Sequence, residues 1–123
     1  MEFKDNTPIY RQIIDYCFGC VLSGAWRPDE KIPSVREMAV SMAVNTHTVL
    51  KAFEYLQLHD IIYPKRGMGF YLSANAPVQV NSTRRQEFFE EKLRDVFKEM
   101  RMLGIGMDDV EASWAEWQAE NAE

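Results

Sequence analysis

The chain has 123 residues, 46% of them hydrophobic, and a formal charge of −5, so it can form one compact core with an appendage but not two full-sized domains. No apolar run approaches the ~18 residues that span a bilayer, and the first residues lack the basic and apolar regions of a signal peptide. We therefore expect a cytoplasmic protein. In that reducing compartment, Cys17 and Cys20 are not expected to form a disulfide framework. Basic and acidic residues balance up to residue 76 and the whole acidic excess lies beyond it, so the net charge does not exclude DNA binding by the first part.

Residues 8–23 are predicted to form the first helix. Thr7-Pro8 is typical of a helix start, because Thr can cap the N-terminus and Pro at the first position loses no hydrogen bond. Apolar residues then recur at three- and four-residue spacing, and Gly24 can take the left-handed conformation that ends a helix. Residues 27–30 predict a turn, and the short extended segment 31–33 follows it.

Residues 34–58 are predicted to form two helices joined by a tight turn. A Ser-x-x-Glu capping box begins at Ser34 and predicts the start of a short second helix. After a three-residue turn, Asn45 or Thr46 can cap a third helix that runs to about Leu58. Two short helices joined in this way are a helix-turn-helix. Their predicted buried positions are Met38, Ala39, Met42, Val49, Phe53 and Leu56.

A β-hairpin is predicted after the third helix, because the period of the apolar residues changes there from 3.6 to 2. Residues 61–63 and 70–72 are the two strands, and the basic, glycine-containing segment 64–69 connects them. Helix, helix-turn-helix and hairpin in this order predict a winged helix-turn-helix domain over residues 1–76. Residues 77–82 have neither charge nor a regular apolar period, and they are predicted to be a linker.

Residues 83–123 are predicted to contain two helices. Capping-box patterns begin at Thr83 and Asp108, and Gly104 is expected to end the first of the two helices. Apolar residues of the first helix recur at alternating four- and three-residue steps, and two tryptophans give the second helix an apolar edge. We call these residues the apolar seam: Phe89, Leu93, Val96, Phe97, Met100, Leu103, Trp114 and Trp117.

The apolar seam is too large to remain exposed on a tail that has no core of its own. Packing against a second copy of the chain is the simplest explanation, and it would make residues 83–123 a dimerisation region. The alternative is that the tail folds back on its own winged helix. The predicted fold class is therefore mainly α with a small β-hairpin: a winged helix-turn-helix followed by a two-helix C-terminal dimerisation tail.

Four segments, in the same order, resemble the DNA-binding domain of the GntR family over about residues 8–73. They are Pro8-Ile-Tyr-Arg-Gln-Ile13, Lys31-Ile-Pro-Ser-Val-Arg-Glu-Met-Ala39, Val44-Asn-Thr-His-Thr-Val49 and Lys65-Arg-Gly-Met-Gly-Phe70. The turn over residues 102–110 resembles that of the small YtrA-type branch, in which a helical tail serves dimerisation. The sequence departs from the family pattern at three places. Asp29 stands where the family usually has Gly, Leu50 stands where a small or basic residue is common, and Gly67-Met-Gly-Phe70 replaces the more usual small polar end of the wing.

The resemblance implies a sequence-specific, DNA-binding transcription regulator, acting as a homodimeric repressor on a palindromic operator near a promoter. It assigns Arg36 to DNA, and a guanidinium beside a helix N-terminus can bind a phosphate or a guanine; a surface Arg paired with Glu37 or Asp29 is the alternative. The start of a recognition helix points into the major groove, and a basic wing tip suits a narrow minor groove, although helix capping, solvent exposure or a solubilising turn would also account for these residues. The predicted DNA-binding residues are Ser34, Arg36, Asn45, Thr46, His47, Thr48, Lys51, Lys65, Arg66 and Gly67.

Cys17 and Cys20 form the only pattern typical of an enzyme. A redox pair needs an exposed cysteine at a helix N-terminus, whereas these lie inside a helix on an apolar stripe, and a zinc site would need two further ligands when only His47 and His59 are available. We expect buried thiols, no enzyme activity, no cofactor, no metal and no dedicated ligand pocket, and leave the identity of any small-molecule effector open. The alternative function is a winged-helix protein-interaction module.

Overall fold

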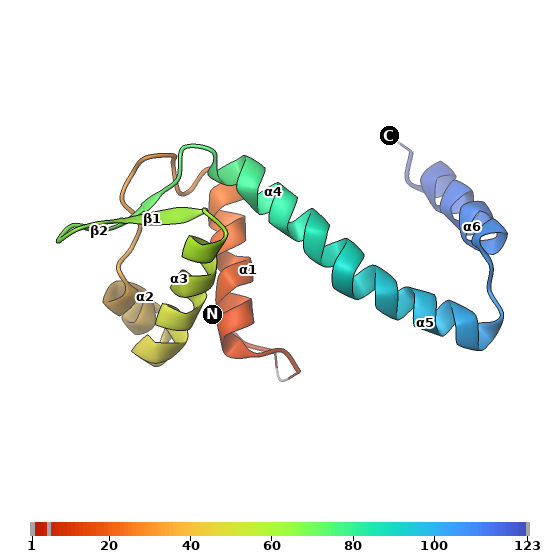
Figure 1. Cartoon of the computed structure of the whole chain (residues 1–123), viewed down its shortest axis with the longest axis horizontal. Coiled ribbons are helices and arrows are strands. Elements are labelled where there is room, and N and C mark those ends of the chain that lie inside the picture. The colour runs from red at the N-terminus through yellow and green to blue at the C-terminus, as the bar shows by residue number, and fades with distance from the viewer. Residues whose placement is uncertain (1, 5, 123) are drawn as a thin grey trace. The chain divides into compact units, whose positions relative to one another are not determined.

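The computed structural model describes residues 2–4 and 6–122 and forms two compact units (Figure 1). The first unit ends at Arg84 and the second begins at Arg85. The described elements are helices apart from one antiparallel hairpin, which confirms the predicted mainly α fold with a winged helix-turn-helix. None of the described helices combines the length and the apolar character that crossing a membrane requires.

Helix α1 (Ile9–Leu22) packs one apolar face into the core of the first unit. Phe18, near its C-terminal end, has no exposed surface. The predicted cap at Thr7 is wrong: Pro8 holds the N-cap position and no side chain caps the helix. The helix ends as predicted, because Gly24 takes the left-handed conformation with φ +82° just beyond it.

Helices α2 (Val35–Met42) and α3 (Thr46–Leu58) form the predicted helix-turn-helix. Both hydrogen bonds of the capping box are present, since Ser34 Oγ accepts from the backbone N–H of Glu37 at 3.0 Å and the Ser34 N–H donates to Glu37 Oε1 at 3.2 Å. Asn45 caps α3 by accepting a backbone N–H at 2.8 Å. The residues predicted to be buried on these two helices are buried: Met38, Ala39, Met42, Val49, Phe53 and Leu56.

Strands β1 (Ile62–Lys65) and β2 (Gly69–Leu72) form the wing as an antiparallel pair with Ile62 opposite Leu72. The predicted strands 61–63 and 70–72 are therefore correct in place, and the observed strands extend further toward the tip. The predicted extended segment joins them, because Lys31 forms an isolated bridge with Tyr71.

Asp29, where the GntR resemblance leads one to expect glycine, lies at a turn position with a left-handed backbone. Its φ is +63°, a conformation in which glycine carries no steric penalty and Asp is tolerated better than most residues. Two hydrogen bonds hold it there: its backbone N–H donates to the Leu72 carbonyl at 2.8 Å, and the Tyr63 hydroxyl donates to its Oδ1 at 3.1 Å. The turn is therefore connected to both strands of the wing.

Helix α4 (Ala76–Glu87) occupies the segment 77–82 that was predicted to be a linker, so that prediction is wrong. Pro77 lies in the first turn of the helix, where its missing N–H would have no helical partner in any case. Val80 is fully buried in the core of the first unit, and Thr83 is almost fully buried. The capping box predicted at Thr83 is also wrong, because this residue lies inside the helix rather than at its start.

The second unit continues with a π-helical turn, η1 (Phe88–Lys92), and helix α5 (Leu93–Leu103), and ends with helix α6 (Met107–Glu120). Gly104 ends α5 in the left-handed conformation, as predicted. Helix α6 starts slightly earlier than the predicted capping box, because the Gly106 N–H donates to the carboxylate of Asp109 at 3.0 Å. None of the residues in η1, α5 and α6 is buried.

Two valines on α4 test whether this helix belongs to the core. Val80 has no exposed surface, whereas Val78 is 68% exposed. We expect Val80→Ala to lower the free energy of unfolding by about 2 kcal/mol, because two buried methyl groups are lost and a cavity remains. Val78→Ala should change it by less than about 0.5 kcal/mol. Urea unfolding followed by far-UV circular dichroism measures both, and equal effects of the two substitutions would contradict the packing of α4.

The turn between α2 and α3 contains a strained residue. Ala43 has φ 55° and ψ 47°, the left-handed conformation that costs an L-residue about 1–2 kcal/mol. Its side chain is exposed, so no packing offsets that strain. The strain is tolerated because the turn is fixed by hydrogen bonds, including that from the Val44 N–H to the Ala39 carbonyl at 3.0 Å.

Ala43→Gly should therefore stabilise the protein. The relief of strain exceeds the entropy that glycine adds to the unfolded chain, and we expect a gain of roughly 0.5–1 kcal/mol in the free energy of unfolding. Ala25→Gly is the matched control, since Ala25 is also exposed but has no positive φ. That control should be neutral or destabilising in the same urea experiment. A loss of stability in Ala43→Gly would show that the turn is not strained.

Candidate nucleic-acid interface

The N-terminus of α2 presents an exposed guanidinium. Arg36 lies in the first turn of the helix and is exposed. Within the described part of the chain it makes no ion pair with Glu37 or Asp29, the partners that the alternative interpretation required. Glu37 is instead held by the capping box: hydrogen bonds from the backbone N–H and the hydroxyl of Ser34 keep its pKa below the usual value.

The first turn of α3 is polar and exposed. Asn45, Thr46 and His47 are exposed, Thr48 is half-buried, and Asn45 uses its side chain as the helix cap. No group of three His, Cys, Asp or Glu side chains among the described residues could hold a metal ion. The next turn exposes 40% of Leu50 to solvent, so this face of the helix offers both hydrogen-bonding groups and one apolar contact.

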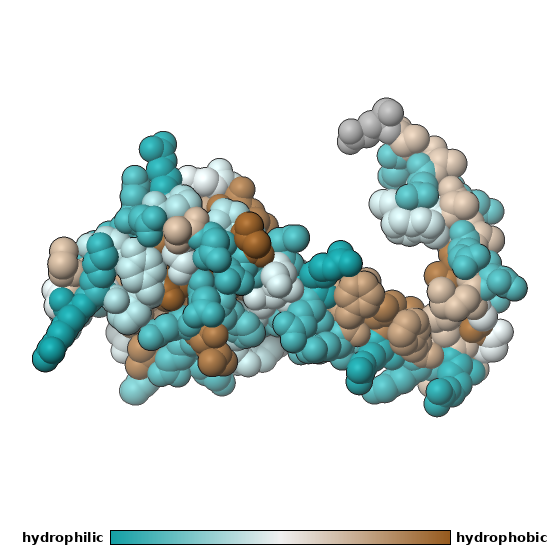
Figure 2. Space-filling model, turned by 45° about the horizontal axis from the view of Figure 1, so that its top comes forward, coloured by the Kyte–Doolittle hydropathy of each residue, from teal (hydrophilic) through white to brown (hydrophobic). Residues whose placement is uncertain are grey.

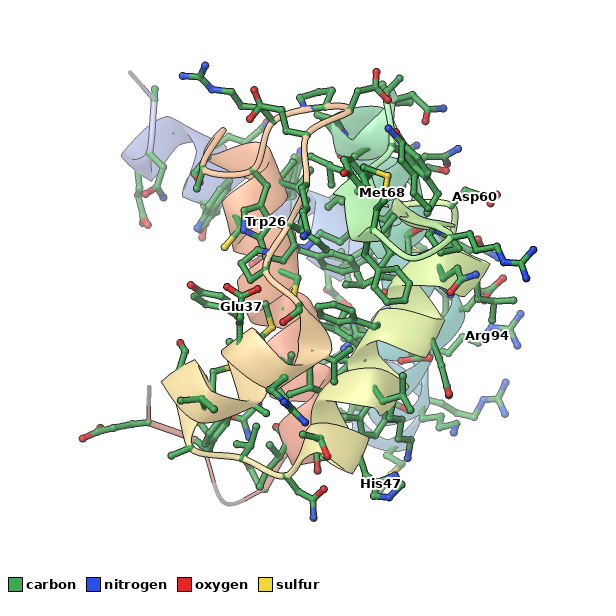
Figure 3. All side chains as sticks on the ribbon, turned by 90° about the vertical axis from the view of Figure 1, so that its left-hand side faces the viewer. Trp26, Glu37, His47, Asp60, Met68 and Arg94 are labelled. Carbon is green, nitrogen blue, oxygen red and sulfur yellow. The ribbon has the colours of Figure 1, made fainter. Side chains whose placement is uncertain are left out.

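The wing tip is basic and bends through glycine. Lys65 and Arg66 are exposed, and Gly67 and Gly69 have φ values of +74° and +87°. A hydrogen bond from the Met68 N–H to the Lys65 carbonyl, 2.9 Å long, closes the turn. Helices α2 and α3 and the wing lie on one side of the first unit, shown in Figure 3 with His47 and Met68 at its two ends. The structure thus brings the three predicted segments onto one face.

Two tyrosines that contact the predicted lysines were missed by the sequence analysis. The Lys51 ammonium lies 3.9 Å from the ring centroid of Tyr10 on α1, and that of Lys65 lies 4.1 Å from the ring of Tyr71. Such cation–π contacts hold a long side chain in one region without neutralising it. Nothing local in the sequence indicates the first pair, because its two residues come from different helices. The second pair, Lys65 and Tyr71, could have been predicted, because the two residues lie near each other on the two strands of the hairpin.

The cysteine pair is buried, as predicted. Cys17 and Cys20 are free thiols on the core side of α1. Burial raises the pKa of Cys17 well above its ordinary value, so the thiolate needed for redox chemistry is disfavoured.

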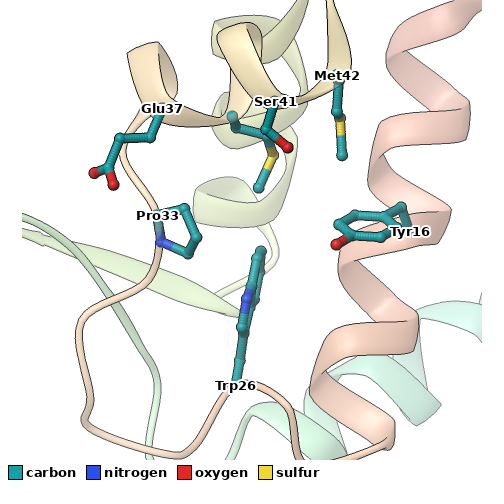
Figure 4. A pocket seen from close by; sticks show the side chains of 7 residues that line it. Tyr16, Trp26, Pro33, Glu37, Ser41 and Met42 are labelled. Carbon is teal, nitrogen blue, oxygen red and sulfur yellow. The ribbon is translucent and has the colours of Figure 1, made fainter. Parts of the chain in front are cut away.

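A cavity of about 270 Å³ lies between α1, α2 and the segment that connects them. This finding differs from the expectation that the chain contains no dedicated pocket. Figure 4 shows the aromatic rings of Tyr16 and Trp26 beside the cavity, with Ser41 and Met42 approaching it from α2. Its lining residues are Tyr16, Trp26, Pro33, Glu37, Met38, Ser41 and Met42.

Comparisons with known proteins agree with this arrangement. The chain is 33% identical over 105 residues to the HTH-type transcriptional repressor YtrA of Bacillus subtilis, an alignment that covers 85% of this chain and 80% of YtrA. A putative GntR-family transcriptional regulator from Bacteroides thetaiotaomicron has a similar structure, with a TM-score of 0.75 and 37% identity over 92% of this chain and 99% of the other.

A second similar structure contains operator DNA. It is the DNA-binding domain of AraR in complex with operator ORR3, with a TM-score of 0.54 and 26% identity, covering 59% of this chain and 88% of that domain. The model of the family described as bacterial regulatory proteins, gntR family, matches residues 9–72, which include the helix-turn-helix and the wing. The chain is therefore a DNA-binding transcription regulator that belongs to the GntR family.

Proposed function

We propose that this protein is a homodimeric repressor that binds a two-fold symmetric operator near a promoter and blocks transcription by occupying it. Residues 1–76 would be the DNA-binding domain and residues 83–123 the dimerisation region. The observation that carries the proposal is the exposed apolar seam of the second unit, in a chain whose basic and acidic residues balance up to residue 76.

The seam supports a second copy of the chain as the partner. Phe89, Val96 and Phe97 are each about half exposed, and Figure 2 shows brown and tan apolar side chains along η1 and α5. The stacked rings of Trp114 and Trp117, with centroids 5.6 Å apart, continue the apolar surface on α6. An apolar surface of this kind with no buried core beneath it marks an interaction site in a soluble protein.

The charge distribution supports a dimer on DNA. Because the basic and acidic residues up to residue 76 balance, one DNA-binding unit attracts phosphates only through the local field of one face. Two such units joined by the second unit would bind with a much higher effective concentration. A two-fold dimer would place two copies of α3 in major grooves about one helical turn apart.

On each half-site, the three segments would have different tasks. Lys51 and Lys65 would neutralise phosphates, while the first turn of α3, with Thr46 and His47, would read base edges. Leu50 can contribute an apolar contact, for example to a thymine methyl group. Arg36 would bind a phosphate or a guanine from the N-terminus of α2. The remaining proposed contacts are Ser34, Asn45, Thr48, Arg66 and Gly67.

Repression rather than activation is supported by the relative YtrA of Bacillus subtilis, which is a transcriptional repressor. Occlusion of a promoter requires only that the dimer remain bound, so it needs no contact with RNA polymerase.

Charge reversal at Arg36 tests the DNA contacts. Arg36→Glu should weaken binding to the DNA upstream of the protein's own gene by on the order of 10- to 100-fold. If Arg36 contacts a phosphate, the slope of log K against log salt should also fall by about one. Fluorescence anisotropy at several salt concentrations measures both quantities.

Arg27→Glu is the matched control for this experiment. Arg27 is exposed on the first unit but lies in the turn after α1, outside the three segments. The Arg27→Glu substitution changes the net charge by the same amount as Arg36→Glu, and it should reduce DNA binding far less. Unchanged binding in Arg36→Glu would favour a winged-helix protein-interaction module instead.

A charge in the apolar seam tests dimerisation. Val96→Glu should raise the dimer dissociation constant at least tenfold, since it places a carboxylate in an apolar interface. Because fewer dimers then form, the affinity of this variant for the upstream DNA should also fall. Met102→Glu is the control on the same helix, because Met102 is 84% exposed and lies outside the seam. Sedimentation equilibrium measures both variants. A Val96→Glu protein that dimerises like the parent would refute the seam as the interface.

A further inference from the structure

We propose that Met68, at the tip of the wing, selects A·T base pairs by filling the part of the minor groove in which a guanine would place its 2-amino group. The inference deepens the proposed function and rests on it, because the wing must lie against DNA. It assigns base selection to an apolar side chain that the predicted DNA contacts leave out.

Met68 is the apolar side chain of a very short tip. The last residue pair of the wing is Lys65 with Gly69, so the tip consists of residues 66–68. Figure 3 shows Met68 at one end of the face that carries α2 and α3. It is 55% exposed, and among the described residues it belongs neither to the buried core nor to the partly buried side chains packed against it. Packing within the first unit therefore gives no reason for an apolar side chain at this position.

The backbone of the tip holds Met68 in a defined and narrow setting. Its N–H donates to the Lys65 carbonyl at 2.9 Å, which closes the turn. The residues on either side, Gly67 and Gly69, both have left-handed φ values and carry no side chain. A Cβ added at Gly67 would meet nothing within 4 Å, so the space beside Met68 is open. One side chain between two glycines can enter a groove that is only ~6 Å wide.

Two basic residues beside Met68 supply the attraction to the groove. The Lys65 ammonium lies 4.1 Å from the ring centroid of Tyr71, which holds it at the base of the tip. Arg66 is exposed on the tip itself. These charges draw the wing toward a groove with a strong negative potential. Selection by the groove floor would then fall to Met68.

The chemistry of a thioether favours A·T pairs over G·C pairs. The minor-groove floor of an A·T pair presents only acceptors, whereas a G·C pair adds the amino group of guanine, which is a donor. A methionine sulfur is a weak acceptor. An amino group covered by Met68 would therefore lose its water without gaining a good hydrogen bond. The amino group also occupies the space that the side chain would fill, so Met68 would exclude guanine.

A single added amino group tests this selection. Adenines in the upstream DNA are replaced one at a time by 2,6-diaminopurine, which adds the amino group in the minor groove and keeps the major-groove edge of adenine. We expect binding of the full-length protein to weaken roughly five- to tenfold at about one or two adjacent positions in each half-site. Fluorescence anisotropy at fixed salt measures the affinities.

The variant Met68→Gln separates the side chain from the shape of the DNA. Glutamine is similar in length and offers a carbonyl that accepts from the amino group, so the loss of affinity at those positions should fall below about twofold. Met68→Leu stays apolar and should keep the loss. Met102→Gln, at a residue that is 84% exposed on α5, is the control outside the wing and should keep it too. The absence of any such position in the parent, or an unchanged loss in Met68→Gln, would overturn the inference.

A second measurement separates this inference from the proposed function. Alternating duplexes of inosine·C and G·C pairs differ in base chemistry only by the 2-amino group, and they contain no operator. At low salt, where non-specific binding is strong, the parent should bind the inosine·C duplex about two- to threefold more tightly, and Met68→Gln should bind the two equally. If the protein does not bind its upstream DNA, the proposed function fails and this comparison decides the role of Met68. Equal affinities of the parent for the two duplexes would then overturn it.

Discussion

The packing of α3 between α1 and the wing is the interaction on which the rest of the DNA-binding unit depends. Phe53 on α3 is fully buried and meets the ring of Phe70 on β2 edge to face, with centroids 5.4 Å apart. On the other side, Tyr55 lies 6.2 Å from Phe18 of α1. Aromatic contacts on two sides fix both the direction and the rotation of α3. The exposed residues of its first turn are therefore presented by a rigid support, as a recognition helix requires.

The sequence predicted those features that local chemistry determines. The capping box at Ser34, the hairpin and the ends of α1 and α5 at Gly24 and Gly104 follow from residue types at fixed spacing, and the structure confirms them. Helix α4 was missed because Pro77 and the uncharged residues after it resemble a linker, whereas burial of Val80 against distant residues makes the segment helical. Tertiary packing overrides weak local preference in this way. The stacking of Lys51 on Tyr10 and the cavity beside Trp26 could not be predicted for the same reason, since both arise from contacts between separate elements.

In the proposed dimer, the two units would have complementary roles in recognition. The first unit has the shape that reads DNA but little excess positive charge, and the second has an amphipathic surface but no buried residue in η1, α5 or α6. In an isolated chain, the low positive charge limits the affinity for DNA and the apolar seam stays exposed to water. Two-fold association would double the contacts with phosphate and cover the seam. In this small domain, a few local interactions determine how α2 meets α3. They include the strained turn at Ala43 and the capping box at Glu37.

The central claim, that two copies of the chain bind one operator, is tested most directly by a hydroxyl-radical footprint on the upstream DNA combined with native mass spectrometry of the same complex. The account predicts two protected half-sites related by two-fold symmetry, with centres separated by about one helical turn or a multiple of it, and two chains per DNA duplex. A single protected half-site with one bound chain would contradict it.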